Sequence, residues 1–245
     1  MKIIGVIPAR YESSRLPGKP LADICGKPMI WWVYQQAKKS SKLDFVYAAI
    51  DDERVELVCR DLDIPVIMTN QLHRSHINRL HEVSQKIEAD MYVCICGDEP
   101  LIKVETIEQV IPSEIENDAF IARSLMRVLS DPAETVDPSN LKLVTDTDGY
   151  GLMITRSVIP FPQKTSKFIY KKVVGVECYN KTALDFFAAS EAGFLEKIED
   201  TNLLRFIENH KPIRFIMTDA YQLSVDTSSD LEKVRGIVSE NLKKI

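Results

Sequence analysis

The sequence predicts an α/β fold with a mainly parallel, doubly wound sheet covered by helices on both faces. Apolar, β-branched runs of strand length alternate with amphipathic helical segments through the first half of the chain. The first such run leads into a loop rich in proline and cations, which is typical of the ligand-binding edge of an open α/β sheet. The 245 residues, 45% of them hydrophobic, suffice for one large domain.

The N-terminal elements are a strand, a loop and a helix. Residues 2–8 form an apolar, β-branched run typical of a strand buried on both faces. Residues 7–21, IPARYESSRLPGKPL, cannot form a regular helix because the prolines lack amide donors and glycine relaxes the backbone. A helix is expected to begin at Pro28, a favourable first-turn residue, and to continue through MIWWVYQQAKK.

Further strands and helices alternate up to about residue 100. The expected strands are DFVYAAI, IPVIMT and DMYVCIC, at 44–50, 64–69 and 90–96. The expected helices are DDERVELVCRDL, which begins with acids, and INRLHEVSQKI, whose apolar residues form one stripe. These βαβ units predict a nucleotide-binding type of layer.

The alternation loosens from about residue 119. Residues 141–155 read as two strands around Asp148-Gly149, a hairpin signal. The remaining expected elements are strands at 171–179 and 212–218, helices near 182–190 and 200–209, and a last helix at 228–244 with Ser228 or Ser229 as its cap. We therefore expect a single domain, 1–245, with a hairpin-bearing insertion at about 119–200 that could supply a dimer surface.

Composition excludes several classes of protein. A net charge of −5 without an extended basic stripe argues against nucleic acid as a partner. No apolar run approaches the roughly 18 residues of a membrane span, and no secretory signal is evident, so a cytoplasmic location is expected. Five cysteines, an odd number, suggest reduced thiols. Cys94 and Cys96 read as buried strand residues, and His73, His76 and His81 lack a matching ligand pattern for zinc.

Three cations in the loop at 7–21 indicate an anion site. Arg10, Arg15 and Lys19 follow a buried strand, where cations and loop amides suit a triphosphate. The loop is not a Walker A motif, because Ser13 stands where a glycine is required and Pro20 follows the lysine. It also lacks the glycines of a dinucleotide fingerprint. The alternative is a basic loop that is merely solvated.

Two aspartates could share a metal ion with that loop. Asp98, in GDEP, follows a buried strand, and Asp226 follows the last strand. Mg²⁺ is usually held by one or two carboxylates together with substrate phosphates. The alternative is that Asp226 is a helix N-cap and Asp98 a turn residue. Taken with the cationic loop, the pair favours a site where a leaving pyrophosphate is stabilised.

Four segments carry a resemblance to a known family. IPARYESSRLPGKPLADICGKPMI, GDEPLI, NLKLVTDTDGYGLMITRSVIP and VDTSSDLEKVR resemble, in order, segments of the CMP-sugar synthetases, most of all the 3-deoxy-manno-octulosonate cytidylyltransferases. The resemblance implies a three-layer, Rossmann-like nucleotidyltransferase fold with a dimerisation insertion. It also implies a Mg²⁺-dependent reaction of CTP with a 2-keto-3-deoxy sugar acid, which gives a CMP-sugar and pyrophosphate, and a homodimer.

The resemblance also implies roles for individual residues. Lys19, Arg10 and Arg15 would be catalytic, and Asp98 and Asp226 would bind Mg²⁺. The implied nucleotide-binding residues are Pro8, Ala9, Arg10, Ser14, Arg15, Lys19, Met68, Thr69, Ser75, Arg79 and Gly97. The implied acceptor-binding residues are Arg156, Glu177 and Asn202.

The departures from the family pattern gather in segments associated with the sugar acid. They are the centre of HRSHINR at 73–79, Cys96 before Gly97, VVGVE at 173–177, and Asn202 where a glutamate is usual. The residues for CTP and metal are intact, so we infer that nucleotide activation is retained and that the acceptor pocket has changed. Three hypotheses follow: 3-deoxy-manno-octulosonate as acceptor, the same chemistry on another acid, and a non-catalytic nucleotide-binding protein.

Overall fold

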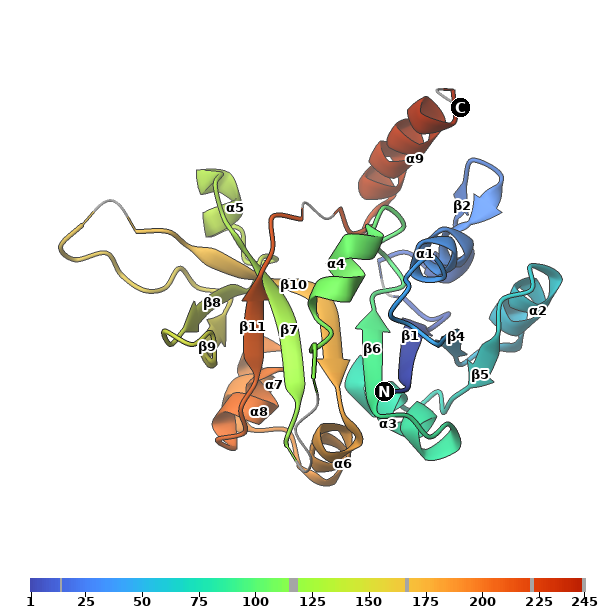
Figure 1. Cartoon of the computed structure of the whole chain (residues 1–245). Helices are drawn as coiled ribbons and strands as arrows, with labels where there is room; N and C mark the ends of the chain where they lie inside the picture. The colour runs from blue at the N-terminus through green and yellow to red at the C-terminus, as the bar shows by residue number, and fades with distance from the viewer. Residues whose placement is uncertain (14, 115–118, 166–167, 221–222, 244–245) are drawn as a thin grey trace.

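A computed structural model describes residues 1–13, 15–114, 119–165, 168–220 and 223–243, with eleven strands among them (Figure 1). The strands of the main sheet are β1 (Ile3–Ala9), β4 (Phe45–Ile50), β5 (Val66–Met68), β6 (Met91–Ile95), β7 (Ala122–Val128), β8 (Lys142–Thr145), β9 (Gly151–Thr155), β10 (Lys171–Tyr179) and β11 (Arg214–Met217). A separate two-stranded ribbon consists of β2 (Asp23–Ile24) and β3 (Lys27–Pro28).

Helices follow most strands. They are α1 (Met29–Ala37), α2 (Glu53–Asp61), α3 (His76–Lys86), α4 (Val104–Gln109), α5 (Pro132–Val136), α6 (Lys181–Ala189), α7 (Phe194–Glu199), α8 (Leu204–Glu208) and α9 (Ser228–Leu242), with a 3₁₀ turn, η1 (Lys19–Leu21). No helix among these described residues is both long and apolar enough to cross a membrane.

The main sheet is mixed, with the order β11-β7-β10-β6-β1-β4-β5. The strand β1 lies between β4 and β6 and is parallel to both, and β4 is parallel to β5, as the βαβ pattern predicts. The long strand β10 runs antiparallel between β6 and β7, whereas β7 and β11 are parallel. The predicted α/β class with a mostly parallel central sheet is confirmed, and β10 is the antiparallel exception within the path.

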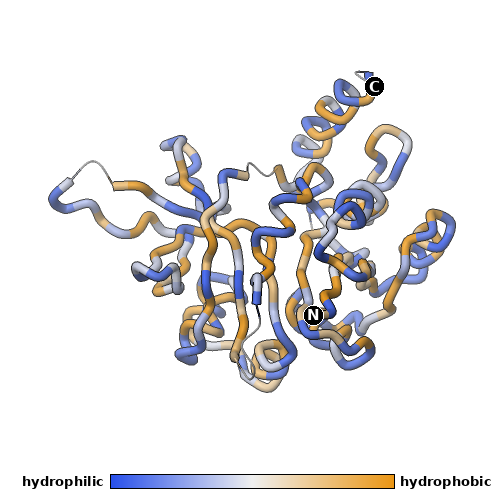
Figure 2. The backbone as a smooth tube through the Cα atoms, viewed as in Figure 1, coloured by the Kyte–Doolittle hydropathy of each residue, from blue (hydrophilic) through white to orange (hydrophobic). Residues whose placement is uncertain are grey.

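Two hydrophobic clusters, one on each face of the sheet, pack helices against it, so the fold has three layers: helices, sheet and helices. On one face, Ile3 and Ile7 of β1 pack in a cluster with residues of α1, α2 and α4. On the other face, Ile4 and Val6 pack with residues of α3, α6 and α8. Successive side chains of a strand point to opposite faces, so both faces of β1 are buried. Figure 2 shows the hydrophobic residues gathered along these central strands.

The last helix is held by a third cluster, away from the sheet. Leu231 and Val234 of α9 pack with Val225 and with Ile24 of β2 and Met29. The helix begins with a capping box: Thr227 accepts from the Asp230 amide, and the Asp230 carboxylate accepts from the Thr227 amide. The expectation that Ser228 or Ser229 caps this helix is therefore wrong, because the preceding threonine already occupies the extended N-cap conformation.

The expected hairpin is present. Strands β8 and β9 pair antiparallel, and Gly149 in the turn has a φ of 87°, a left-handed conformation suited to glycine. Beyond β9, residues 156–165 and 168–170 belong to a long arm that projects from the body of the molecule in Figure 1. The expected helix at 200–209 is shorter, as α8, and α7 precedes it.

Candidate functional site

The cationic loop that follows β1 meets both predicted carboxylates. Lys19 Nζ lies 2.7 Å from Asp98 Oδ2 and 3.1 Å from Asp226 Oδ1. Arg15 donates to the same Asp226 oxygen at 2.9 Å. Residues from three distant parts of the chain therefore converge at one point, as the sequence predicted.

The segment before α9 is joined to the loop after β6 by a backbone hydrogen bond. The Val225 amide donates to the Asp98 carbonyl at 2.8 Å, which fixes the loop before α9 against the loop after β6. Because Thr227 caps α9, Asp226 lies just before the helix and its side chain is free for the cationic loop. This arrangement excludes the alternative in which Asp226 is itself the N-cap.

Gly97 is required by close packing of two loops. A Cβ atom built on Gly97 would lie 2.8 Å from the Pro8 carbonyl oxygen, closer than side-chain carbons approach backbone oxygens. The loop after β6 can therefore lie against the end of β1, and this packing places Asp98 near the loop that carries Lys19. Carboxyl ends of neighbouring parallel strands form the usual ligand-binding crevice of such sheets.

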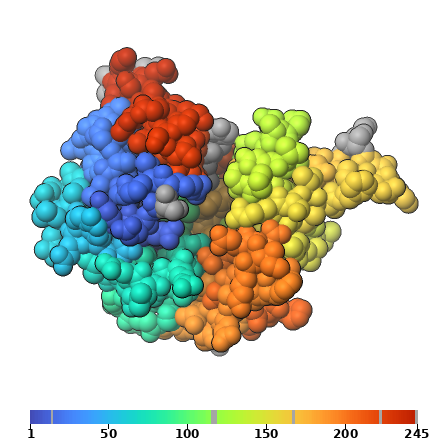
Figure 3. All heavy atoms as spheres, turned by 180° about the vertical axis from the view of Figure 1, so that it is seen from behind, coloured from blue at the N-terminus to red at the C-terminus, as the bar shows by residue number. Residues whose placement is uncertain are grey.

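Two adjoining cavities open at this edge of the sheet. The first, about 200 Å³, is lined by Pro8, Ala9, Arg10, Ser13, Arg15, Lys19, Pro20, Gly97, Asp98 and Asp226. The second, about 250 Å³, is lined by Pro8, Arg10, His73, Arg74, Ser75, His76, Arg79, Cys96, Gly97 and Asp98. They share Pro8, Arg10, Gly97 and Asp98, so they form one continuous cleft. Figure 3 shows the molecule hollowed between the N-terminal segments, in blue, with the last helix, in red, above them, and the segments drawn in green and yellow.

Arg79 is held in a buried polar network beneath this cleft. Its guanidinium donates to Asp51 Oδ2 at 2.9 Å and to the Thr69 hydroxyl. Asp51 Oδ1 also accepts from the Tyr11 amide at 3.0 Å, which ties the network to the cationic loop. Thr69 and Met68 line a neighbouring, more open cavity, so they lie beside the cleft described above and do not line it. Sequence reasoning missed Asp51, although it directly follows a strand end.

The electrostatics of the cleft are dominated by Lys19 and its partners. Burial alone would lower the pKa of Lys19, but Asp98 and Asp226 outweigh burial and raise it, so the ammonium stays charged. Glu99 lies next to Asp98 and is 4% exposed. Burial, with the nearby charge of Asp98, holds its pKa well above the usual range. Its Oε2 atom has no hydrogen-bond partner among the described residues, and sequence reasoning missed this buried carboxyl.

His76 and Glu177 form an ion pair at the wall of the second cavity. His76 Nε2 lies 2.7 Å from Glu177 Oε2, which also accepts from the Tyr179 hydroxyl at 2.8 Å. Burial would lower the pKa of His76, but the Glu177 carboxylate raises it to about 9. Cys94 is close enough that the three could ligate a metal ion, but the histidine and the carboxylate already satisfy each other.

The other predicted acceptor residues have local structural partners. Arg156 donates to the backbone carbonyls of Glu199 and Pro138 at 2.8 and 3.0 Å. Asn202 donates to Glu196 Oε1 at 3.0 Å. Neither residue lines the cleft described above. These two roles remain predictions.

The placement of Ile77 changes one sequence interpretation, whereas Ser75 lines the cleft and also has a structural role. Ile77, interpreted as a substitution in the acceptor pocket, is fully buried in the core beneath α3, whereas Cys96 does line the cleft. Ser75 caps α3 by accepting from the Ile77 amide at 3.1 Å. Ser14 lies outside the described residues.

The two carboxylates fit a hard divalent cation. Both reach the same ammonium within 3.1 Å, so one cation between them could be ligated by both. Carboxylate oxygens are the ligands that Mg²⁺ prefers, and the adjoining cations would hold the phosphates that complete its shell. Mg²⁺ binding by Asp98 and Asp226 is therefore compatible with the residues present.

The fold and this cleft define a nucleotidyltransferase. The cytidylyltransferase family matches residues 4–213, so the chain belongs to the cytidylyltransferase family. It is 39% identical to a 3-deoxy-manno-octulosonate cytidylyltransferase of Fusobacterium nucleatum, with all of both chains covered. An Escherichia coli protein of the same name is 38% identical, with 98% of each chain covered.

A solved structure agrees with this assignment. It is that of a CMP:2-keto-3-deoxy-manno-octonic acid synthetase complexed with CTP, which superposes with a TM-score of 0.92. That chain is 37% identical to this one, and the match covers 98% of this chain and 100% of the other. The resemblance in the sequence motifs is thus confirmed at the level of the family and of the fold.

Proposed function

We propose that the enzyme transfers CMP from CTP to the anomeric hydroxyl of 3-deoxy-manno-octulosonate and releases pyrophosphate. The observation that carries the proposal is the meeting of Lys19 with Asp98 and Asp226 beside Arg10 and Arg15. The full-length similarity to enzymes of that name supports the choice of substrates.

In this reaction the sugar hydroxyl attacks the α phosphorus of CTP in line. A new phosphorus–oxygen bond forms, the bond to the β phosphate oxygen breaks, pyrophosphate leaves with that electron pair, and the hydroxyl proton is released. Arg10, Arg15 and Lys19 hold the triphosphate and neutralise charge that develops on the leaving group.

Asp98 and Asp226 are the proposed holders of Mg²⁺, which when bound polarises the phosphate and neutralises its charge. Lys19 contacts both carboxylates in this structure. Asp51 positions Arg79 and the loop at Tyr11, so its role is to support the nucleotide side of the cleft.

The proposal is tested by measuring pyrophosphate release with CTP, Mg²⁺ and 3-deoxy-manno-octulosonate. We expect release to require all three and Asp98→Asn to abolish it, because the amide loses the charge that holds the metal. Asp148→Asn, at the exposed turn of the hairpin, is the matched control and should retain full turnover. Undiminished turnover in Asp98→Asn would reject the metal role.

A second candidate keeps the chemistry and changes the acceptor acid. It is favoured by the His76–Glu177 pair and Cys96 at the wall of the cleft, at positions that depart from the family pattern. A site built for one set of hydroxyls rejects a ligand that leaves its polar groups unpaired. A screen of 2-keto-3-deoxy sugar acids with CTP, read as pyrophosphate release, separates the two candidates.

We further propose that the enzyme is a cytoplasmic homodimer. Large apolar side chains are exposed on the hairpin and its arm, and such patches mark interaction surfaces: Leu152, Val158, Phe161 and Ile169. The cysteines at all five positions are free, which suits a reducing compartment where CTP is made.

A further inference from the structure

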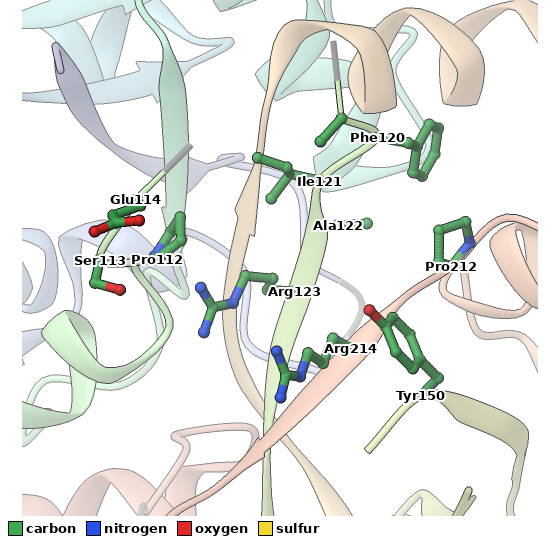
Figure 4. Close-up of a pocket in the computed structure, with 11 residues that line it drawn as sticks. Pro112, Ser113, Glu114, Phe120, Ile121, Ala122, Arg123, Tyr150, Pro212 and Arg214 are labelled. Atoms are coloured by element: carbon green, nitrogen blue, oxygen red, sulfur yellow. The ribbon is translucent and has the colours of Figure 1, made fainter. Parts of the chain in front are cut away.

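Two arginines lie side by side on the sheet, away from the catalytic cleft. Arg123 of β7 and Arg214 of β11 are register partners on neighbouring parallel strands, so their side chains leave the same face of the sheet. Figure 4 shows both guanidinium groups pointing in the same direction, toward the segment with Pro112 and Ser113.

Two positive charges on neighbouring strands repel each other unless an anion neutralises them. Like charges on directly opposed strand positions destabilise a sheet. Among the described residues, neither Arg123 nor Arg214 has an ion-pair partner, and the buried Nε atom of Arg123 has no hydrogen-bond acceptor. Burial, with the nearby Arg214, lowers the pKa of Arg123. The pair therefore presents unused donors and unneutralised charge.

Arg123 and Arg214 line a cavity of about 340 Å³, a volume within the range of small-molecule sites. Its walls combine both guanidinium groups with the hydroxyl groups of Ser113 and Tyr150 and with apolar surface from Phe120 and Pro212. In Figure 4 the Tyr150 ring stands beside Arg214; the guanidinium carbon lies 6.0 Å from its centroid. Glu114, at the rim, is exposed and pairs with neither arginine among the described contacts.

We propose that this cavity binds a small phosphate monoester. A phosphate dianion matches the two guanidinium charges and offers several oxygens to donors that come from two strands. The aromatic and proline walls suit a compact organic group attached to the phosphate. A carboxylate carries one charge and would leave the second guanidinium unneutralised.

The site is distinct from the nucleotide cleft. The cleft is formed by loops at the carboxyl ends of β1 and β6. The strand β7 runs in the same direction as β6, because β10 is antiparallel to both, and Arg123 lies near the amino end of β7. The two sites are therefore at opposite edges of the sheet, and the ligand would not contact the reacting atoms.

The test is a titration of the ¹⁵N-arginine-labelled enzyme with phenyl phosphate, followed through the side-chain Nε–H signals. Arg123→Gln and Arg214→Gln assign the two signals by their loss. We expect the signals of Arg123 and Arg214 to move together and to saturate. In Arg214→Gln, the concentration at which the Arg123 signal is half shifted should rise about tenfold, since one charge-assisted contact is lost.

Matched controls separate this site from general anion binding. Arg60→Gln removes an exposed arginine of α2 and should leave the titration unchanged. Phenol, which lacks the phosphate, should move neither signal, and inorganic phosphate should bind more weakly than phenyl phosphate. Thermal melting verifies that each variant is folded; Arg214 is exposed, so its variant provides the measurement even if Arg123→Gln does not fold.

The proposal is overturned if phenyl phosphate shifts the cleft arginines Arg10 and Arg15 while Arg123 and Arg214 do not respond. It is also overturned if Arg214→Gln leaves the response of Arg123 unchanged. Equal affinity for inorganic phosphate and phenyl phosphate would reject a monoester as the ligand. These readouts do not depend on turnover, so they stand apart from the proposed cytidylyl transfer.

Discussion

At the scale of single residues, Lys19 joins the two carboxylates of the cleft. Its ammonium contacts Asp98 and Asp226, so it offsets the repulsion between two carboxylates and faces the space proposed for the phosphates. The role of Lys19 depends on the tertiary contacts of its loop and not on the secondary structure of Lys19 itself. A lysine elsewhere on the surface would contact neither carboxylate.

Replacing Lys19 by methionine should lower kcat by at least about 100-fold, because a fixed positive charge at the developing pyrophosphate is lost. Steady-state kinetics with CTP and the acceptor measures the effect. Lys164→Met, on the exposed arm, is the matched control and should behave as the unaltered enzyme. A Lys19 variant with unchanged kcat would refute the assigned role.

The His76–Glu177 pair predicts how stability depends on pH. The pKa of His76 is raised from 6.5 to about 9, so the stabilisation from the pair is complete below about pH 6.5 and is lost as pH rises through about 9. The pKa of Glu177 is lowered, although burial alone would raise it, because His76 stabilises the carboxylate. The stabilisation that the Glu177 carboxylate contributes is lost as pH falls through its lowered pKa.

Denaturant unfolding across this range checks the pH dependence. The free energy of unfolding of the unaltered enzyme should fall between pH 6.5 and 9, and Glu177→Gln should remove most of that fall. A cycle with His76→Gln and the double variant isolates the pair from other titrating groups. If the free energy of unfolding depended on pH in the same way in all four proteins, the pair would not be the source of the pH dependence.

The sequence predicted much of the cleft at this scale, because residues at the carboxyl ends of parallel strands meet at one sheet edge. Lys19, Asp98 and Asp226 were found in this way. The pKa shifts of Glu99 and His76 come from burial and, for His76, from Glu177 of β10, a strand that comes late in the chain. No local sequence pattern reveals these contacts. For the same reason sequence could not show that Arg156 would bond to backbone carbonyls.

At the scale of elements, the capping box of α9 determines where Asp226 lies. Thr227→Ala removes the side chain that accepts from the Asp230 amide and should cost about 1 kcal/mol. The apparent affinity for Mg²⁺ should fall as well, since the cap fixes the residue next to Asp226. Thermal melting and a Mg²⁺ titration of turnover measure the two effects.

Thr182→Ala, at an exposed position of α6, provides the matched comparison for the cap. It should change neither the melting temperature nor the dependence on Mg²⁺. A Thr227 variant as stable as this control would mean that the third hydrophobic cluster holds the helix without help from its cap.

Elements with clean periodicity were predicted, and those without it were missed. The hairpin followed from Asp148-Gly149 and its flanking apolar runs. The strand β7, ARSLMRV, was missed because Arg123 and Arg127 interrupt its apolar run. Its neighbouring residues Leu125 and Met126 are nevertheless buried, one on each face of the sheet. The short helices α4, α5 and α7 have too few turns for a helical period to emerge.

At the scale of the whole molecule, the projecting arm predicts an association of two chains. Phe161 is 81% exposed and belongs to the same arm as the exposed Val158 and Ile169. Exposed apolar side chains that gather in one region are typical of interaction surfaces. Phe161→Ser should shift the enzyme from dimer to monomer in light scattering coupled to size exclusion. Leu57→Ser, which alters a 63% exposed leucine of α2, should leave the mass unchanged.

A monomeric mass for the unaltered enzyme at the concentrations used for kinetics would contradict this prediction. The sequence suggested a dimer surface from the hairpin-bearing insertion, and the homodimer itself from the resemblance, because a sequence pattern alone does not distinguish an exposed arm from a buried hairpin. The exposure of the arm supplies the physical reason to test it.

The hydrogen bond between Val225 and Asp98 has a consequence for synthesis of the protein. Asp226 comes after β11, the last strand of the main sheet, so the two carboxylates meet only once the segment before α9 has folded back onto the loop after β6. A growing polypeptide that has not reached residue 226 therefore has the cationic loop and only one of the two proposed Mg²⁺ ligands.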